Sequence, residues 1–231
     1  MPCDGPGRKR NRPVTSRLTT ILLVLGLGFC LLYFLQSGTT AIRLPGNQQG
    51  YQPEQPIRFS HQLHAGDLQI GCLYCHSGAE RSRNAGIPAA SFCMNCHKFV
   101  TAPFGSVRAE SDDAEKEQHQ ARLIVSPEIQ KLYDAVGFVP NQPPDSTRPQ
   151  TPIVWNKIYN VPDYVRFDHR PHVNAGVVCQ DCHGPVETME RVSQVPDLSM
   201  GWCVNCHRDA TANGIAGKPV RATLDCSACH Y

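Results

Sequence analysis

The sequence predicts a mostly irregular fold of short helices, preceded by one N-terminal transmembrane helix. Three observations predict it: five C-x-x-C-H pentads that hold ten of the twelve cysteines, two spaced histidine pairs, and one uncharged apolar run. Two thiols three positions apart can each add to one vinyl group of a haem, and the histidine that follows can bind the iron. The pentads therefore predict five covalently bound haem c groups, which supply much of the apolar core that so short a chain otherwise lacks.

The predicted attachment cysteines and proximal iron ligands are Cys72, Cys75, His76, Cys93, Cys96, His97, Cys179, Cys182, His183, Cys203, Cys206, His207, Cys226, Cys229 and His230. Two alternatives compete with haem. The separations between neighbouring pairs also fit zinc ribbons, and exported cysteines can form disulfides. However, zinc sites do not need a histidine after every pair, and five pairs cannot all be matched into two-pair ribbons. Haem is the favoured interpretation.

The N-terminus consists of a basic segment, 1–17, followed by an apolar segment, 18–36. A helix over Leu18 to Leu35 is roughly 27 Å long, close to the ~30 Å core of a bilayer. A cleaved signal peptide, a lipoprotein signal and a buried helix are the alternatives. Basic residues before the span predict a cytoplasmic N-terminus. We therefore expect the bacterial inner membrane, with the haem-binding part in the periplasm.

The haem-binding part repeats itself. FSHQLH (59–64) comes shortly before the first pentad, and FDHRPH (167–172) comes shortly before the third. Each copy continues through a Gly-containing spacer, a pentad, a loop and a second pentad, and only the later copy adds a further pentad. The predicted domains are a cytoplasmic basic tail (1–17), a transmembrane helix (18–36), a dihaem module (37–101), a cysteine-free connector (102–152) and a trihaem module (153–231).

The connector begins with an acidic stretch that is typical of a solvated helix. Ser126 and Pro127 then form a good helix start, and Gly137 predicts the end of that helix. A proline-rich segment follows and is expected to be extended. The sequence does not predict what the connector does.

Five histidines lie outside the pentads. The pairs His61/His64 and His169/His172 recur at the same offset in both copies, which predicts that all four are distal iron ligands. His119 lies in a run of charged and amide residues, which is typical of a solvated side chain.

Each copy resembles the small multihaem cytochromes of class III type, in which an F-x-H-x-x-H element precedes the first pentad. The resemblance implies the ligand pairs His61 with His76, His64 with His97, His169 with His183, and His172 with His207. It also places Met200 opposite His230, where the family has a histidine. A His/Met pair has a higher reduction potential than a bis-histidine pair. Met189 and His119 are the other candidates for this fifth distal ligand.

The whole chain past Leu18, with GVVCQDCHGPVETM and LSMGWCVNCHR, resembles the pentahaem cytochrome c subunit of bacterial alternative complex III. The resemblance implies an electron-transfer subunit that is not an enzyme by itself. Its implied partners are integral-membrane quinol-oxidising subunits, an iron–sulfur subunit, and a periplasmic monohaem cytochrome or copper protein as acceptor. Nothing in the sequence suits nucleic acid, because the net charge of +2 comes from the N-terminal cluster. The alternatives are a membrane-anchored quinol dehydrogenase acting by itself, and a reductase.

Overall fold

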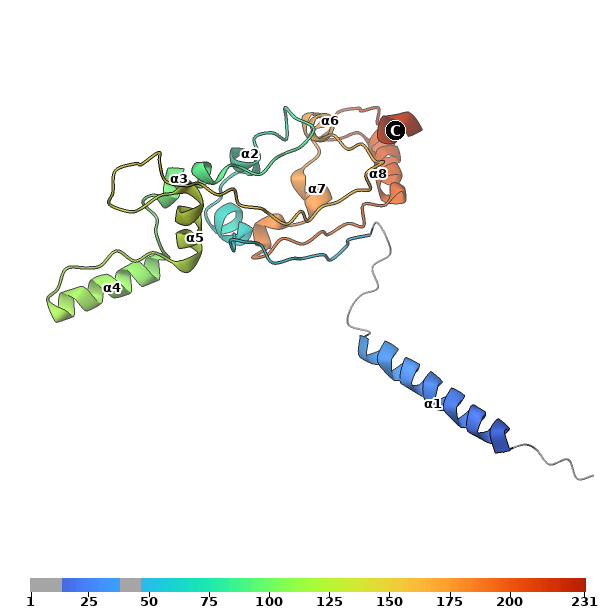
Figure 1. The fold of residues 1–231 in the computed structure, drawn as a ribbon. Coiled ribbons are helices and arrows are strands. Elements are labelled where there is room, and N and C mark those ends of the chain that lie inside the picture. The colour runs from blue at the N-terminus through green and yellow to red at the C-terminus, as the bar shows by residue number, and fades with distance from the viewer. Residues whose placement is uncertain (1–13, 38–46) are drawn as a thin grey trace, which may run out of the picture. The chain divides into compact units, whose positions relative to one another are not determined.

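The computed structural model describes residues 14–37 and 47–231 (Figure 1). Most of the predicted cytoplasmic tail, and the start of the predicted dihaem module, lie outside these residues. The chain divides into two compact units, Met1–Leu44 and Pro45–Tyr231. All five pentads belong to the second unit.

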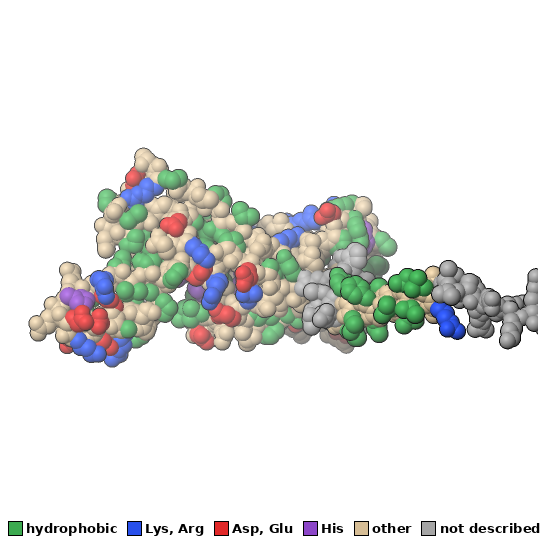
Figure 2. Space-filling view, turned by 60° about the horizontal axis from the view of Figure 1, so that its bottom comes forward, with side chains coloured by type: hydrophobic (Ala, Val, Ile, Leu, Met, Phe, Trp, Pro, Cys, Tyr) green, Lys and Arg blue, Asp and Glu red, His purple; other side chains and the backbone are tan. Residues whose placement is uncertain are grey.

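The residues of the first unit that the structure describes form one helix, α1 (Val14–Ser37). Its described apolar side chains, such as Leu22 and Leu27, are exposed (Figure 2). The described part of the chain holds no helix that is both long enough and apolar enough to cross a membrane. The prediction of a helix over 18–36 is therefore confirmed, but its prediction as a membrane span is not.

The second unit consists of short helices joined by irregular segments. Within its described residues there is no β-strand, and only two isolated β-bridges occur, Val165 with His230 and Ile215 with Lys218. The predicted mostly irregular fold is thus confirmed. The helical elements are η1 (Gln62–Asp67, a π-helix), α2 (Cys72–Cys75), α3 (Ala90–His97), α4 (Phe104–Glu117), α5 (Pro127–Val136), α6 (His169–Ala175), α7 (Cys179–His183), η2 (Val186–Thr188, a 3-10 helix), α8 (Met200–Asn213) and α9 (Cys226–Cys229).

The connector forms two helices. Ser126 caps α5, since its hydroxyl accepts a hydrogen bond from the Ile129 amide. Gly137 ends α5 in the left-handed conformation with φ +66°. Acidic side chains gather over α4 at one end of the second unit (Figure 2), where the buried Glu110 carboxylate pairs with both Nε and Nη2 of Arg122. Both expected helices form.

The connector packs on the second pentad. Helix α5 contacts α3, which carries that pentad, and the fully buried Tyr133 hydroxyl donates a 2.6 Å hydrogen bond to the His97 carbonyl. Thr101 and Ser126 extend the contact: the Ser126 amide donates to the Thr101 carbonyl, and the Thr101 hydroxyl donates to the Ile124 carbonyl. The connector therefore braces the end of α3, where helical carbonyls lack partners within the helix.

Replacing Tyr133 by phenylalanine removes this brace without changing the ring. We expect the free energy of unfolding to fall by about 1–2 kcal/mol, because the His97 carbonyl loses the hydroxyl of the buried Tyr133 as its partner. Denaturant titration followed by haem absorbance measures the change. Tyr231→Phe, which alters an exposed tyrosine, is the matched control and leaves the midpoint unchanged.

Candidate haem-binding sites

Both cysteines of each pentad lie on a helix, and in the first and fifth pentads the helix ends at the second cysteine. Positions three apart on a helix share one face, so both thiols of a pentad are presented together. Hydroxyl and carboxylate caps start two of these helices: Ser199 accepts from the Trp202 amide at the start of α8, and Asp225 accepts from the Ser227 amide at the start of α9. The local backbone thus suits attachment of a haem through two thioethers.

The first and third pentads each face a distal histidine. The ring centres of His61 and His76 are 6.5 Å apart, and those of His169 and His183 are 6.4 Å apart; the two rings of each pair are nearly parallel, at 4°. Two nitrogens bound to one metal at about 2 Å each, plus the distance from each nitrogen to its ring centre, give roughly 6 Å between ring centres. Both pairs therefore fit the two sides of one iron.

The second and fourth pentads show the same arrangement with tilted rings. His64 lies 6.0 Å from His97 at 58°, and His172 lies 5.9 Å from His207 at 38°. All four pairs that the class III resemblance implies are therefore brought together, and the parallel and tilted geometries recur in the same order in both halves.

A phenylalanine lies beside each distal pair. The Phe59 ring is 4.9 Å from His61 and 4.3 Å from His64, and the Phe167 ring is 4.8 Å from both of its histidines. In the second copy Asp168 caps α6, because its carboxylate accepts a hydrogen bond from the Arg170 amide. Each F-x-H-x-x-H element thus positions two ligands toward two neighbouring pentads.

Backbone carbonyls orient most of these rings through Nδ1. A donating Nδ1–H fixes the tautomer that leaves Nε2 free to bind a metal. The pentads and the two F-x-H-x-x-H elements together hold nine histidines. Six of them are held in this way: His64 by Ser60, His76 by Gly86, His97 by Val100, His169 by Arg83, His172 by Asp168 and His207 by Thr223. Nδ1 of His61 is instead buried with no hydrogen-bond partner among the described residues.

Burial keeps two of the rings uncharged. It lowers the pKa of His61 to about 4, with a further contribution from the neighbouring His76 and His64. Burial likewise lowers the pKa of His183 to about 4, followed by the effects of His169 and His76. A neutral imidazole is the form that binds iron, so both rings suit a ligand role at neutral pH.

Apolar side chains beside the pentads offer a surface to a porphyrin. Leu63, Leu68, Leu73, Tyr74, Ile87, Val178, Val195 and Leu224 are all exposed on the polypeptide. Exposed apolar groups in such number mark a binding surface, and a porphyrin ring is apolar enough to cover them. Together with the histidine pairs, this surface fits covalently bound haem c.

The fifth pentad lacks a facing histidine. The aromatic ring beside His230 is that of Tyr164, with its centre 5.9 Å away. Met200 is the first residue of α8 and is 68% exposed, whereas Met189 is half-buried between the two halves. Sequence reasoning did not single out Tyr164, because its position depends on the bridge between Val165 and His230.

His119 lies apart from the pentads. Its Nε2 is 3.9 Å from the Asp113 carboxylate and 4.0 Å from that of Glu117, and its side chain is exposed at the end of α4. This surface setting agrees with the predicted solvated role.

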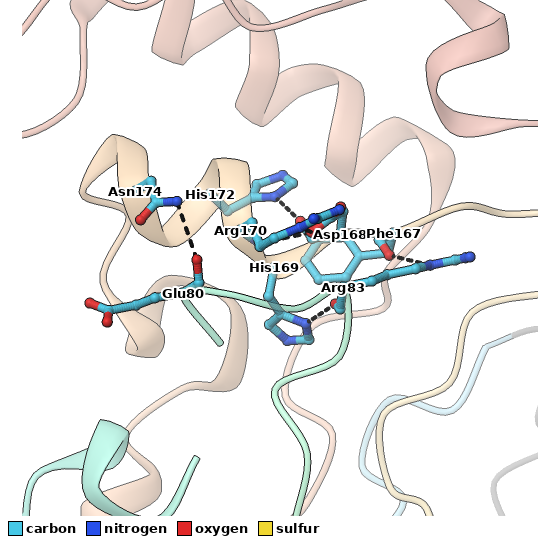
Figure 3. Close-up of polar contacts among 8 residues, drawn as sticks. All are labelled: Glu80, Arg83, Phe167, Asp168, His169, Arg170, His172 and Asn174. Atoms are coloured by element: carbon cyan, nitrogen blue, oxygen red, sulfur yellow. Dashed lines mark hydrogen bonds and ion pairs between the residues drawn. The ribbon is translucent and has the colours of Figure 1, made fainter. Parts of the chain in front are cut away.

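Two further residues support the sites and were missed in the sequence. The Tyr159 hydroxyl lies 2.9 Å from the His183 carbonyl, as Tyr133 does at the second pentad. The Arg83 carbonyl accepts a hydrogen bond from Nδ1 of His169, and Nε of Arg83 donates a 2.9 Å hydrogen bond to the Phe167 carbonyl (Figure 3). These contacts join segments far apart in the sequence, so no local pattern indicates them.

Arg83→Ala removes the side-chain half of this contact. We expect the free energy of unfolding to fall by about 1 kcal/mol, because the Phe167 carbonyl loses a charge-assisted donor at the surface. Chemical denaturation of the haem-loaded protein measures it. Arg81→Ala, in the same loop and exposed, is the matched control; equal losses in both variants would contradict a specific role for Arg83.

Comparison with known proteins places this geometry in context. Residues 165–231, which hold the last three pentads, match the family described as cytochrome c7 and related cytochrome c. The chain is also 31% identical over 132 residues to the "Menaquinone reductase, multiheme cytochrome c subunit" of Nitratidesulfovibrio vulgaris (strain Hildenborough). That alignment covers 57% of this chain and 47% of the relative, so the chain spans about half the length of the relative it matches. The C-terminal region is therefore similar to the multihaem domains of the cytochrome c7 type.

Proposed function

We propose that this chain is a pentahaem cytochrome c that relays electrons between a quinol-oxidising membrane complex of the alternative complex III type and a periplasmic acceptor. The observation that carries the proposal is the four histidine pairs, each spaced to fill both axial positions of one iron. Haem c, when bound, takes up and releases one electron at its iron. With two histidines to hold each of four irons, these sites would suit electron transfer rather than activation of a substrate.

The chain's own residues hold and tune the sites. Cysteine pairs fix the porphyrin edge, carbonyl-bound imidazoles fix the iron axis, and Tyr133 and Tyr159 secure the backbone of two proximal histidines. Rigid ligands of this kind keep an iron in one geometry in both oxidation states. Quinone chemistry would then belong to partner subunits, and the relative's name supports a quinone-related complex.

The partners that we propose are integral-membrane quinol-oxidising subunits and an iron–sulfur subunit, with a periplasmic monohaem cytochrome or copper protein as acceptor. We also propose that the haem-binding part lies on the periplasmic side of the bacterial inner membrane, where haem is attached to C-x-x-C-H pentads. Protease treatment of spheroplasts followed by haem staining tests the location: digestion without lysis is expected, and protection until lysis would contradict it.

The haem-loaded chain, purified alone and with its membrane partners, tests the function. We expect mass and haem content to give five haems, spectra to be low-spin, and a quinol analogue to reduce the haems only when the partner complex is present. Oxidation of the quinol analogue by the chain alone would overturn the proposal in favour of a quinol dehydrogenase acting by itself. The direction of transfer follows from comparing quinol-driven reduction with quinone-driven oxidation of the same haems.

A further inference from the structure

The two copies of the repeat meet at the first and third pentads. The loop after the first pentad holds the distal element of the third: the Arg83 carbonyl accepts from both the His169 amide, at 3.1 Å, and its Nδ1, at 2.9 Å. The Asn174 amide group, on the same helix α6, donates to the Glu80 carbonyl (Figure 3). The first half therefore positions a distal histidine that belongs to the second half.

Residues of the second half in turn position the distal element of the first half. The Gln62 amide donates a 3.0 Å hydrogen bond to the Met189 carbonyl, and the Ser60 hydroxyl donates to the Glu190 carboxylate. Elements η1 and η2 pack so closely that a Cβ at Gly66 would collide with the Glu187 carbonyl oxygen. The loop after the third pentad thus positions the element that carries His61.

The thiols at this junction are also neighbours. Cys179 is the first cysteine of the third pentad, and Cys72 is the first cysteine of the first pentad; burial raises the pKa of Cys179, and the nearby Cys72 thiol raises it further. The contact brings together the two attachment points that lie closest to the junction.

Contacts within each half show which of the remaining haem sites lie next to each other. Phe59 contacts the distal ligands of both the first and the second site, and Phe167 contacts those of both the third and the fourth. The fourth site adjoins the fifth, since Nδ1 of His207 donates a 2.6 Å hydrogen bond to the carbonyl of Thr223, just before the last pentad. Figure 1 agrees: α3 lies at one end of the second unit with α4 and α5, α8 and the C-terminus lie at the other, and α2, α6 and α7 lie between.

We infer that the five haem sites follow the order second, first, third, fourth, fifth in space, with the first and third sites as the junction between the halves. The order along the sequence would instead make the second and third sites neighbours. The connector, residues 102–152, joins these two sites in the sequence, yet it packs on the second site and so closes one end of the array. The second and fifth sites are then its two ends. This inference rests on the proposed haem sites.

Nuclear magnetic resonance on the fully reduced, diamagnetic full-length protein tests the order. Nuclear Overhauser effects between haem protons report which haems are neighbours, and the variants His64→Met and His169→Met assign the second and third haems by the loss of one ligand signal each. We expect effects between the first and third haems and none between the second and third. Effects between the second and third, with none between the first and third, would overturn the inference.

A redox titration of the same variants provides an independent measurement. A histidine-to-methionine change raises the potential of one haem, so that this haem is reduced before the haems that keep two histidine ligands. In His64→Met the added electron should shift the first haem by roughly twofold more than the third, because charge interactions fall with distance. A larger shift of the third haem contradicts the order. Haem content separates the two proposals: fewer than five haems defeats the proposed function, whereas five haems in another order defeats this inference alone.

Discussion

Replacing His169 by alanine is expected to turn one of the five haems from six-coordinate to five-coordinate. The ring of His169 lies 6.4 Å from that of His183 and is nearly parallel to it, and the Arg83 carbonyl fixes the orientation of the His169 ring. Without it the iron loses its distal ligand, so about one fifth of the haem absorbance becomes high-spin and the potential of that haem rises. Optical spectra and a redox titration of the purified protein measure both effects.

His119→Ala is the matched control for this experiment. His119 is exposed beside Asp113 and Glu117, and its removal leaves spectrum and potentials unchanged. An unchanged low-spin spectrum in His169→Ala would mean that another group binds that iron, and the pairing of His169 with His183 would then be wrong. A high-spin fraction in the control would make His119 a ligand.

Replacing Met200 by histidine is expected to lower the potential of the fifth haem. If Met200 binds opposite His230, the change converts a His/Met pair into a bis-histidine pair, and the potential falls by on the order of 0.1 V, a small part of the roughly 0.8 V range set by axial ligands. Potentiometry identifies the fifth haem, because a His/Met pair gives it the highest potential of the five before Met200 is replaced. The other four potentials stay in place.

Two further variants make the assignment of the fifth site specific. Met94→Leu, inside the second pentad, is the methionine control and leaves all potentials unchanged. Tyr164→Phe tests the ring that lies beside His230. A spectral change in Tyr164→Phe, together with no effect of Met200→His, would assign the distal side of the fifth site to the tyrosine and reject the methionine.

Local patterns were sufficient to predict the pentads, both connector helices and the irregular fold. Each depends on residues that are close in the sequence, such as the Ser126 cap and the Gly137 stop of α5. Duplication predicted that the four spaced histidines are distal ligands, because a pattern found twice at one offset indicates a shared role. Their partners were implied by the class III resemblance, and the structure brings those partners together. For the apolar run, helix formation was predicted correctly.

Long-range contacts could not be predicted in this way. Arg83 and Tyr159 act through hydrogen bonds to segments that are 84 and 24 residues away, and neither belongs to a motif. The hydrogen bond between Tyr133 and His97 could not be predicted from the neighbouring residues either. The apolar face of α5 predicts that this face is buried, but it does not predict which part of the protein covers it. The spatial order of the sites depends on the same contacts, so the sequence left it open.

The reciprocal contacts between the halves also bear on how the protein matures. The first half is synthesised first, but the element that carries His61 obtains its partners Met189 and Glu190 only from the second half. Haem can thus be attached to Cys72 and Cys75 before the distal side of that site has been assembled. A chain truncated before residue 189 would therefore hold any haem at Cys72 and Cys75 without the contacts that position His61, its proposed distal ligand.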